Sequence, residues 1–420
     1  MANGAATGTV AGRPQPQTTA EPAGGPFVRH APDGRRAMYV NASAAQGTQN
    51  PQFIANPMVS SPGWNKGYRV LTQVSGGTST AIGTISADAP FNFHQLVQMK
   101  DAFGTQLLTG PGYEISNLVP LYSGQFGTDE MRPPQNSPQF GPVNSTNGAG
   151  GDTFTFPTFF PFEFAKGYGV ISGANAALLP VLQINAAPIT TVAAAATFST
   201  FPASTVTVDA DFYWLPNVPA DPPGIGTTCQ WIFQPCNPTI PSAASTLVQL
   251  PRLGGYLTML ILELRNSAGI RVGEGATTQG GAGAATLDAG TGWPLRPKIL
   301  VDGVPLIDSL FGTLQEDLAI SQQIGALGGN NQATAGGTAN GTAQTYRPLG
   351  TMAISRKNGL AQRDFGLLET GEVFLSTNPG TQIEVAGYPW GTVTTGPMTL
   401  NVIVGQVVPS GALVRGLPEA

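Results

Sequence analysis

The side chains that could carry out acid–base chemistry are few in this chain. Its 420 residues include only two histidines, His30 and His94, whereas general acid–base catalysis needs a histidine or a positioned carboxylate. His94 lies in an aromatic stretch, FNFHQL, and is best explained as a sheet residue. Asp209 and Asp211 have the spacing of a carboxylate pair on one strand face. They fill the polar positions of an alternating strand, however, which indicates a solvated face.

The remaining candidates lack the partners that a catalytic or metal site requires. The adjacent acids Asp129–Glu130 and Glu316–Asp317 have no basic or metal-ligand partner nearby. Cys229 and Cys236 are spaced so that a disulfide is permitted, and the sequence leaves open whether they are bonded. No histidine lies near them, which argues against a zinc site. The motifs G-x-S-x-G, H-E-x-x-H and C-x-x-C are absent. We therefore expect no enzymatic activity, no cofactor and no metal, although glycosidase carboxylates could occupy unrecognised positions on a β-sandwich.

The composition points to a folded chain whose surface is largely covered. Charged residues make up 10% of the chain, against roughly 25% in ordinary soluble proteins. The 55 Gly and 37 Pro predict a loop-rich protein that is poor in long helices. Because interface cores are depleted in Lys, Glu and Asp, sparse charge favours a protein that lives in an assembly. A secreted β-protein with a Thr-, Ser- and Asn-rich surface is the alternative. The net charge of −5 argues against direct nucleic-acid binding.

The sequence shows neither a secretory leader nor a membrane span. The first residues, MANGAATGTVAGRPQ, contain no apolar core of a signal peptide. The most apolar run, Tyr256–Leu264, is too short to cross a bilayer and contains Glu263. We expect a chain that is made and folded in a cytoplasm.

The clearest expected strands have a period of two. In Thr153–Phe164 the aromatic residues fall on even positions, and in Thr205–Trp214 apolar residues alternate with polar ones up to Trp214. The near-continuous apolar run Tyr256–Arg265 is typical of a central strand that is covered on both faces. Two stretches favour short helices, Tyr113–Tyr122 and Ile307–Ile324, and a long loop follows each, at 124–151 and 325–345.

The second half of the chain repeats the landmarks of the first half in the same order. The strands at 153–164 and 205–214 have counterparts at 349–355 and 398–407, and a charged turn at 100–101 recurs at 301–303. This pattern predicts an all-β fold of two tandem eight-stranded antiparallel jelly rolls, each with one short helix-containing excursion. The expected division is a flexible arm at 1–60, a first jelly roll at 61–215, a proline-rich connector at 216–246, a second jelly roll at 247–410 and a tail at 411–420.

With two β-modules, paired long loops and sparse charge, residues 60–410 resemble the double jelly-roll major capsid proteins of tectivirus-like phages that contain an internal membrane. The resemblance implies a homotrimer that forms a pseudo-hexagonal capsomer, an icosahedral shell over a membrane, and other virion proteins as partners. It places the mature protein in the virion after synthesis in the host cytoplasm. It also implies that Arg29, Arg35 and Arg36 of the arm contact anionic lipid or a neighbouring subunit. The alternatives are another virion protein, such as a spike or vertex protein, and a secreted carbohydrate-binding β-sandwich protein.

Overall fold

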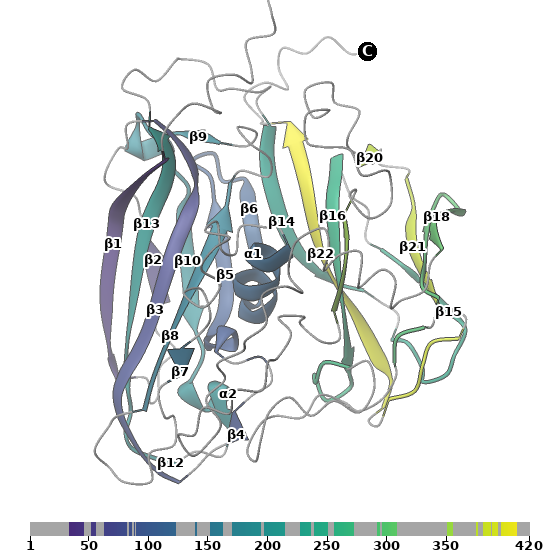
Figure 1. Ribbon diagram of the computed structural model, residues 1–420, viewed down its shortest axis with the longest axis horizontal. Helices are drawn as coiled ribbons and strands as arrows, with labels where there is room; N and C mark the ends of the chain where they lie inside the picture. Colours follow the sequence, from purple (N-terminus) through teal and green to yellow (C-terminus); the bar gives the residue numbers. More distant parts are fainter. Residues whose placement is uncertain are drawn as a thin grey trace, which may run out of the picture.

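A computed structural model of the chain is built almost entirely from β-strands (Figure 1). It describes residues 33–45, 52–55, 63–81, 84–85, 88, 90–122, 139–140, 152–162, 170–194, 197–214, 227–236, 239–250, 256–272, 292–294, 296–308, 351–355, 375–376, 381–387, 389–393 and 396–409. No helix among these residues is long and apolar enough to cross a membrane.

The first module contains two facing sheets of four main strands each. One sheet has the order β1-β13-β3-β8 and the other has the order β2-β10-β5-β6. Their bounds are β1 Asp33–Ala45, β2 Gln52–Ala55, β3 Gly63–Ala81, β5 His94–Lys100, β6 Gln106–Gly110, β8 Asp152–Pro161, β10 Val181–Ala186 and β13 Ala203–Trp214.

The second module repeats this arrangement with strands of its own. Its sheets have the orders β14-β22-β16-β19 and β15-β21-β17-β18. The bounds are β14 Thr227–Pro235, β15 Thr246–Gln249, β16 Tyr256–Asn266, β17 Lys298–Val301, β18 Val304–Asp308, β19 Thr351–Ser355, β21 Ile383–Gly387 and β22 Met398–Pro409.

The two modules have the same topology. When the eight main strands of each module are numbered in chain order, the first, eighth, third and sixth form one sheet, and the second, seventh, fourth and fifth form the other. This is the strand order of a jelly roll, which confirms the predicted fold of two tandem jelly rolls. The repeated landmarks of the sequence are the sixth strands, β8 and β19, and the eighth strands, β13 and β22.

Shorter elements decorate this framework. The two-residue strands are β4 at 84–85, β7 at 139–140, β9 at 171–172, β11 at 193–194 and β20 at 375–376, and β12 is Thr197–Thr200. The helical segments are η1 Phe91–Phe93, η2 Tyr113–Leu118, α1 Val119–Tyr122, η4 Ala176–Leu178 and α2 Ile189–Val192. The π-helical turn of η2 and the short α-helix α1 together cover the helix predicted after β6, at Tyr113–Tyr122. Of the helix predicted at 307–324, residues 307–308 belong to β18 instead, and the rest lies outside the described residues, as do most of the two long loops.

Two segments that the sequence suggested were irregular contain paired strands. The expected arm at 1–60 includes β1, which pairs with β13 from Asp33 to Ala45, and β2, which pairs with β10. Pairing between β-strands uses backbone amide and carbonyl groups and does not require large apolar side chains. The composition of the arm therefore did not reveal β1. The expected connector at 216–246 includes β14, whose only proline is its last residue, Pro235. The surrounding prolines obscured this strand.

A shared sheet joins the two modules. β14 pairs in parallel with β6 of the first module, at Trp231 with Leu108 and at Ile232 with Thr109. On its other side β14 pairs antiparallel with β22 of the second module. The two modules are therefore joined through backbone hydrogen bonds, in one sheet of nine strands.

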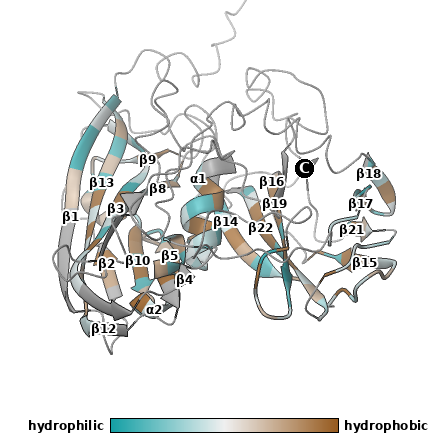
Figure 2. Ribbon diagram, turned by 60° about the horizontal axis from the view of Figure 1, so that its bottom comes forward, coloured by the Kyte–Doolittle hydropathy of each residue, from teal (hydrophilic) through white to brown (hydrophobic). Residues whose placement is uncertain are grey.

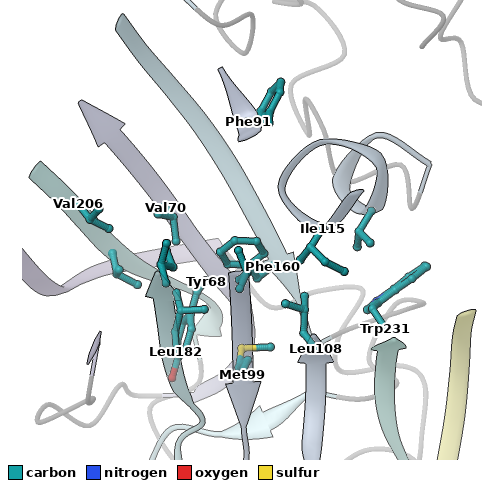
Figure 3. Packing of buried hydrophobic residues seen from close by; sticks show 14 of the residues in the cluster. Tyr68, Val70, Phe91, Met99, Leu108, Ile115, Phe160, Leu182, Val206 and Trp231 are labelled. Atoms are coloured by element: carbon teal, nitrogen blue, oxygen red, sulfur yellow. The ribbon is translucent and has the colours of Figure 1, made fainter. Parts of the chain in front are cut away.

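The first core fills the space between the two sheets of the first module (Figure 3). Phe156, Phe160 and Phe162 are buried in it, as the period of two in β8 predicts. The alternation of β13 ends at a register shift after Asp211. Phe212 and Tyr213 are both buried as a result, and Trp214 is 44% exposed, so the expected inward position of Trp214 is wrong.

The side chains of β14 extend the first core across the boundary between the modules. Trp231 and Cys229 of β14, together with Ile261 and Ile403 of the second module, belong to the first core cluster. The Trp231 ring packs against Gly405 of β22, where an added Cβ would lie 2.5 Å from a ring carbon. A glycine is therefore required at this point for the two strands to pack.

We predict that Gly405→Ala destabilises the fold by about 1–3 kcal/mol, because the added methyl group forces the buried Trp231 ring to move. The free energy of unfolding, measured by denaturant titration, checks this. Thr200→Ala, an exposed position on β12, is the control and should change stability by less than about 0.5 kcal/mol. A Gly405→Ala protein as stable as the parent would show that the junction is loosely packed.

Candidate functional site: the seam between the two modules

His94 is a buried link between elements of the first module. It is the first residue of β5, as expected of a sheet residue, and its ring nitrogens lie 2.9 Å from the Thr72 hydroxyl and 2.8 Å from the Ser116 hydroxyl. Burial lowers the pKa of His94 to about 3, so the ring is neutral at physiological pH. A neutral ring with both nitrogens hydrogen-bonded joins β3, β5 and η2.

Cys229 and Cys236 are two free, buried thiols. Cys229 lies on β14 in the first core, whereas Cys236 follows this strand and lies in the second core. Burial raises the pKa of both thiols, that of Cys236 to about 12. The sequence left open whether these two cysteines form a disulfide, and in this structure they do not.

Asp211 forms an ion-paired cluster instead of lying on a solvated face. Its carboxylate accepts from Arg35 Nε at 2.7 Å and from Arg69 Nη2 at 3.0 Å. It is 7% exposed, whereas Asp209 is half-buried. The solvated-face interpretation is therefore wrong for Asp211, because the two guanidiniums come from β1 and β3, the strands on either side of β13.

The three arginines assigned to the arm have different surroundings. Arg35 and Arg36 are consecutive exposed residues of β1, and Arg35 is held by Asp211. Arg29 lies outside the described residues. The structure therefore places two of the three on an edge strand of the first module.

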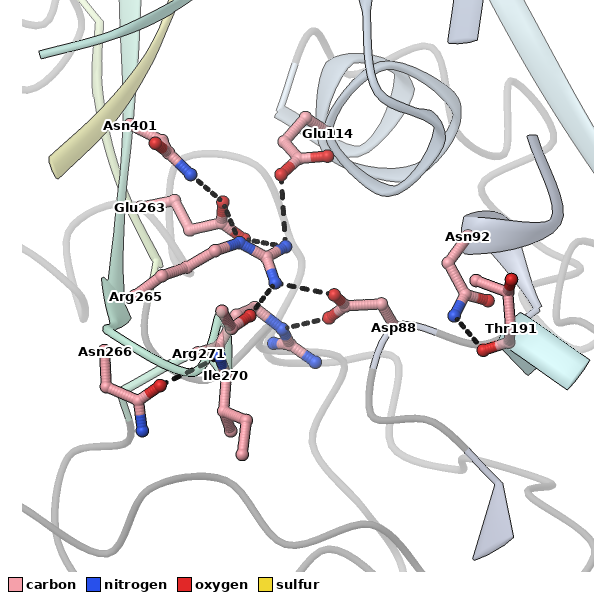
Figure 4. A network of polar contacts seen from close by, with 11 residues as sticks. Asp88, Asn92, Glu114, Thr191, Glu263, Arg265, Asn266, Ile270, Arg271 and Asn401 are labelled. Atoms are coloured by element: carbon pink, nitrogen blue, oxygen red, sulfur yellow. Dashed lines mark hydrogen bonds and ion pairs between the residues drawn. The ribbon is translucent and has the colours of Figure 1, made fainter. Parts of the chain in front are cut away.

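The largest buried charge cluster among the described residues bridges the two modules (Figure 4). Arg265 of β16 reaches from the second module to Asp88 at 2.7 Å and to Glu114 of η2 at 3.1 Å, both in the first module. It also binds Glu263 of its own strand at 2.9 Å. Arg271, which follows β16, binds the other oxygen of Asp88 at 2.7 Å. We call these five residues the seam cluster.

The seam cluster contains three carboxylates and two guanidiniums in a nearly dry site. The Glu263 side chain is fully buried, and those of Glu114 and Arg271 are nearly so. Burial opposes ionisation of Asp88, but Arg271 and Arg265 outweigh it and lower the pKa of Asp88. Burial and the neighbouring Glu263 carboxylate raise the pKa of Glu114 well above its usual range. The raised pKa favours the neutral form of Glu114, which lowers the negative charge of the cluster.

Aromatic and amide groups complete the seam cluster. The Tyr113 ring lies 4.4 Å from the Arg271 guanidinium carbon and 5.7 Å from that of Arg265, which is the geometry of a cation–π contact. Asn401 of β22 donates to Glu263 at 3.2 Å. The arrangement is a structural joint, because every described acid in it faces a cation or a hydrogen-bond donor. The described residues contain no group of three or more His, Cys, Asp or Glu side chains placed to hold a metal ion.

Sequence reasoning noted only one member of the seam cluster. Glu263 stood out as an acid within the apolar run of β16. A charge in a doubly covered strand must find a partner or a proton, so this position carried a usable signal. Its partner Arg265 is two residues away, but Asp88 and Glu114 are more than 140 residues distant and could not be identified without the fold.

No protein-family model matches the chain, and no curated protein matches it. Among solved structures, the STIV MCP, from Sulfolobus Turreted Icosahedral Virus, is similar over 92% of this chain and 100% of its own, with a TM-score of 0.54 and 14% identity. PBCV-1 VP54 is similar over 90% of this chain and 94% of its own, with a TM-score of 0.50 and 13% identity. The Faustovirus major capsid protein has a TM-score of 0.50 and 8% identity over 90% of each chain.

These similarities are at the level of the fold. The chain has the double jelly-roll architecture found in major capsid proteins of large viruses, and the similarity covers nearly all of both chains. The seam cluster lies between the two halves of that architecture.

We predict that the seam cluster makes stability fall as pH rises above the ordinary glutamate pKa, through Glu114. Because the pKa of Glu114 is raised in the fold, its contribution is full below the ordinary glutamate pKa of about 4.3 and is lost as pH rises through the raised value. The loss can reach about 1.4 kcal/mol per pH unit between these two values, where the unfolded chain has released the proton and the fold still holds it. Glu114→Gln imitates the protonated form and should remove this loss.

The measurement is the free energy of unfolding of the parent and the variant at intervals between pH 5 and pH 10. Glu384→Gln, on the half-buried surface of β21, is the control and should follow the parent curve. Parallel curves for the parent and Glu114→Gln would contradict a buried proton at Glu114.

Proposed function

We propose that this chain is a major capsid protein that forms trimeric, pseudo-hexagonal capsomers and tiles an icosahedral shell. The observation that carries the proposal is the double jelly roll itself, which matches viral coat proteins over nearly the whole of both chains. The role is structural rather than enzymatic, and the protein would be found in the virion after synthesis in the host cytoplasm.

The physical properties of the chain agree with a shell. Each chain has two modules of equal topology, so a trimer has six similar units around its axis. This arrangement suits hexagonal tiling. The 10% charged content is low for a dispersed monomer, but it suits a protein whose sides are covered by neighbours. The seam cluster fixes one module against the other, as a tile of constant shape requires.

We further propose the kind of virus, the partner proteins and the role of the three arginines. The virus would be a tectivirus-like phage with an internal membrane, and other virion proteins would be partners. Arg29, Arg35 and Arg36 would contact anionic lipid or a neighbouring subunit.

The mass of the purified protein in solution tests the shell proposal. We expect a stable trimer by light scattering or native mass spectrometry, and larger assemblies as the concentration is raised. A monomer at all concentrations would overturn the proposal. A monomer that binds glycans would instead support the secreted carbohydrate-binding alternative.

Binding to anionic lipid vesicles tests the role of the arginines. Replacing Arg29 and Arg36 together with Ala should weaken binding by about 5-fold for each residue, from about 1 kcal/mol per basic residue at such a surface. Arg296→Ala is the matched control, because its side chain is 59% exposed and it lies in the second module. Equal binding by the double variant and the parent would remove the membrane role of these residues.

A further inference from the structure

The junction within the chain uses one strand edge from each module. β6 is the fifth strand of the first module, and β14 is the first strand of the second module. Their outer edges pair in parallel and make the shared sheet. The same two edges occur once more in the chain: β18 is the fifth strand of the second module, and β1 is the first strand of the first module. Within the part of the chain that the structure describes, β18 and β1 are each the last strand of their sheet.

The directions of these strands suit the same parallel pairing. Neighbouring main strands run antiparallel within each sheet, and the two modules have the same topology, so the first and the fifth strands have the same relative direction in both modules. β6 and β14 are parallel, which gives both modules the same orientation along this direction. β18 of one copy therefore runs parallel to β1 of another copy when the copies stand side by side in the same orientation.

The local geometry of the two fifth strands is also matched. Each strand pairs with the fourth strand of its module through one register shift, which skips Leu107 in β6 and Leu306 in β18. When β6 and β18 are aligned at this register shift, Asp308 corresponds to Thr109. Thr109 lies opposite Ile232 of β14. The covered strand is dry, with Leu107 at 1% and Leu108 at 0% exposed. In β18 the first residue, Val304, is 66% exposed.

The two unused edges lie on opposite sides of the molecule. Figures 1 and 2 both show β1 at one end of the long axis and β18 at the other. An interface between them joins different surfaces, head to tail, and such interfaces close into rings when the rotation allows it. The junction between β6 and β14 would then recur three times within chains and three times between chains.

We infer that β18 of one copy pairs in parallel with β1 of the next copy, so that the contact between chains repeats the junction within the chain. This inference rests on the proposed trimer and identifies its edges. It also gives a specific partner to each of these two edges, which pair with no further strand among the described residues, because an open edge otherwise recruits other chains without control.

Paired cysteines test this contact. Neighbouring strands are about 4.8 Å apart, within the range in which a disulfide can form. Asp308→Cys combined with either Arg36→Cys or Ala37→Cys should give covalent dimers and a closed covalent trimer after mild oxidation, seen in non-reducing electrophoresis. The native thiols are buried and do not compete.

Three controls separate this contact from others. Each single-cysteine variant should stay uncrosslinked, because β1 does not meet β1 and β18 does not meet β18. Asp308→Cys combined with Ile270→Cys, an exposed turn residue after β16, should also stay uncrosslinked. Maleimide labelling of the Ala37→Cys variant should slow at least 10-fold on trimer formation.

The outcomes distinguish this inference from the proposed function. Suppose that the protein is a trimer by mass, that neither double variant forms a disulfide between chains, and that the Ala37→Cys variant is labelled as fast as the monomer. This result would overturn the edge contact and leave the shell proposal intact. Bridging of a single variant would show a like-with-like contact and would overturn the inference. A protein that remains monomeric fails the proposed function itself.

Discussion

The structure depends on Arg265, a cation held between two modules and surrounded by carboxylates from both. A buried ion pair contributes little net stability, because desolvation offsets the attraction, but removal of one partner is costly, about 3–5 kcal/mol. The cluster therefore acts on geometry more than on stability. Any slide or rotation of one module would leave Asp88 or Glu114 buried without its cation. The parallel ladder of β6 and β14 sets the same relation through the backbone.

This fixed relation between modules suits the proposed function of a tile in a shell. Two jelly rolls on a flexible linker could adopt many angles, and a regular lattice would have to select one at an entropic cost. Here the connector contains a strand that belongs to the shared sheet, so the angle is set when the chain folds. Under the proposed function, low charge suits surfaces that neighbours cover, and the seam cluster holds these surfaces in a fixed relation.

Much of the fold could be predicted because the sequence pattern within its most regular strands is enough to identify them. β8, β13, β16 and β22 have apolar patterns that need no knowledge of the rest of the chain. β1 and β14 were missed because their surroundings are rich in glycine, proline and small residues, and their pairing with distant strands decides their structure. The seam cluster was harder to predict from the sequence than these strands. Glu263 was visible as an acid in an apolar run, but Asp88 and Glu114 acquire meaning only when the chain brings them to Arg265.

The placement of Trp231 in the first core has a consequence for biosynthesis. That core also includes Ile261 and Ile403, which the ribosome adds long after the last strand of the first module. The first jelly roll therefore cannot finish its interior until Ile403 has been added, and its unfinished side stays exposed until then. The two halves look like a tandem repeat, but the core of the first half is completed by residues of the second half, so the first jelly roll is not an independent folding unit, and premature association of half-made chains is a hazard.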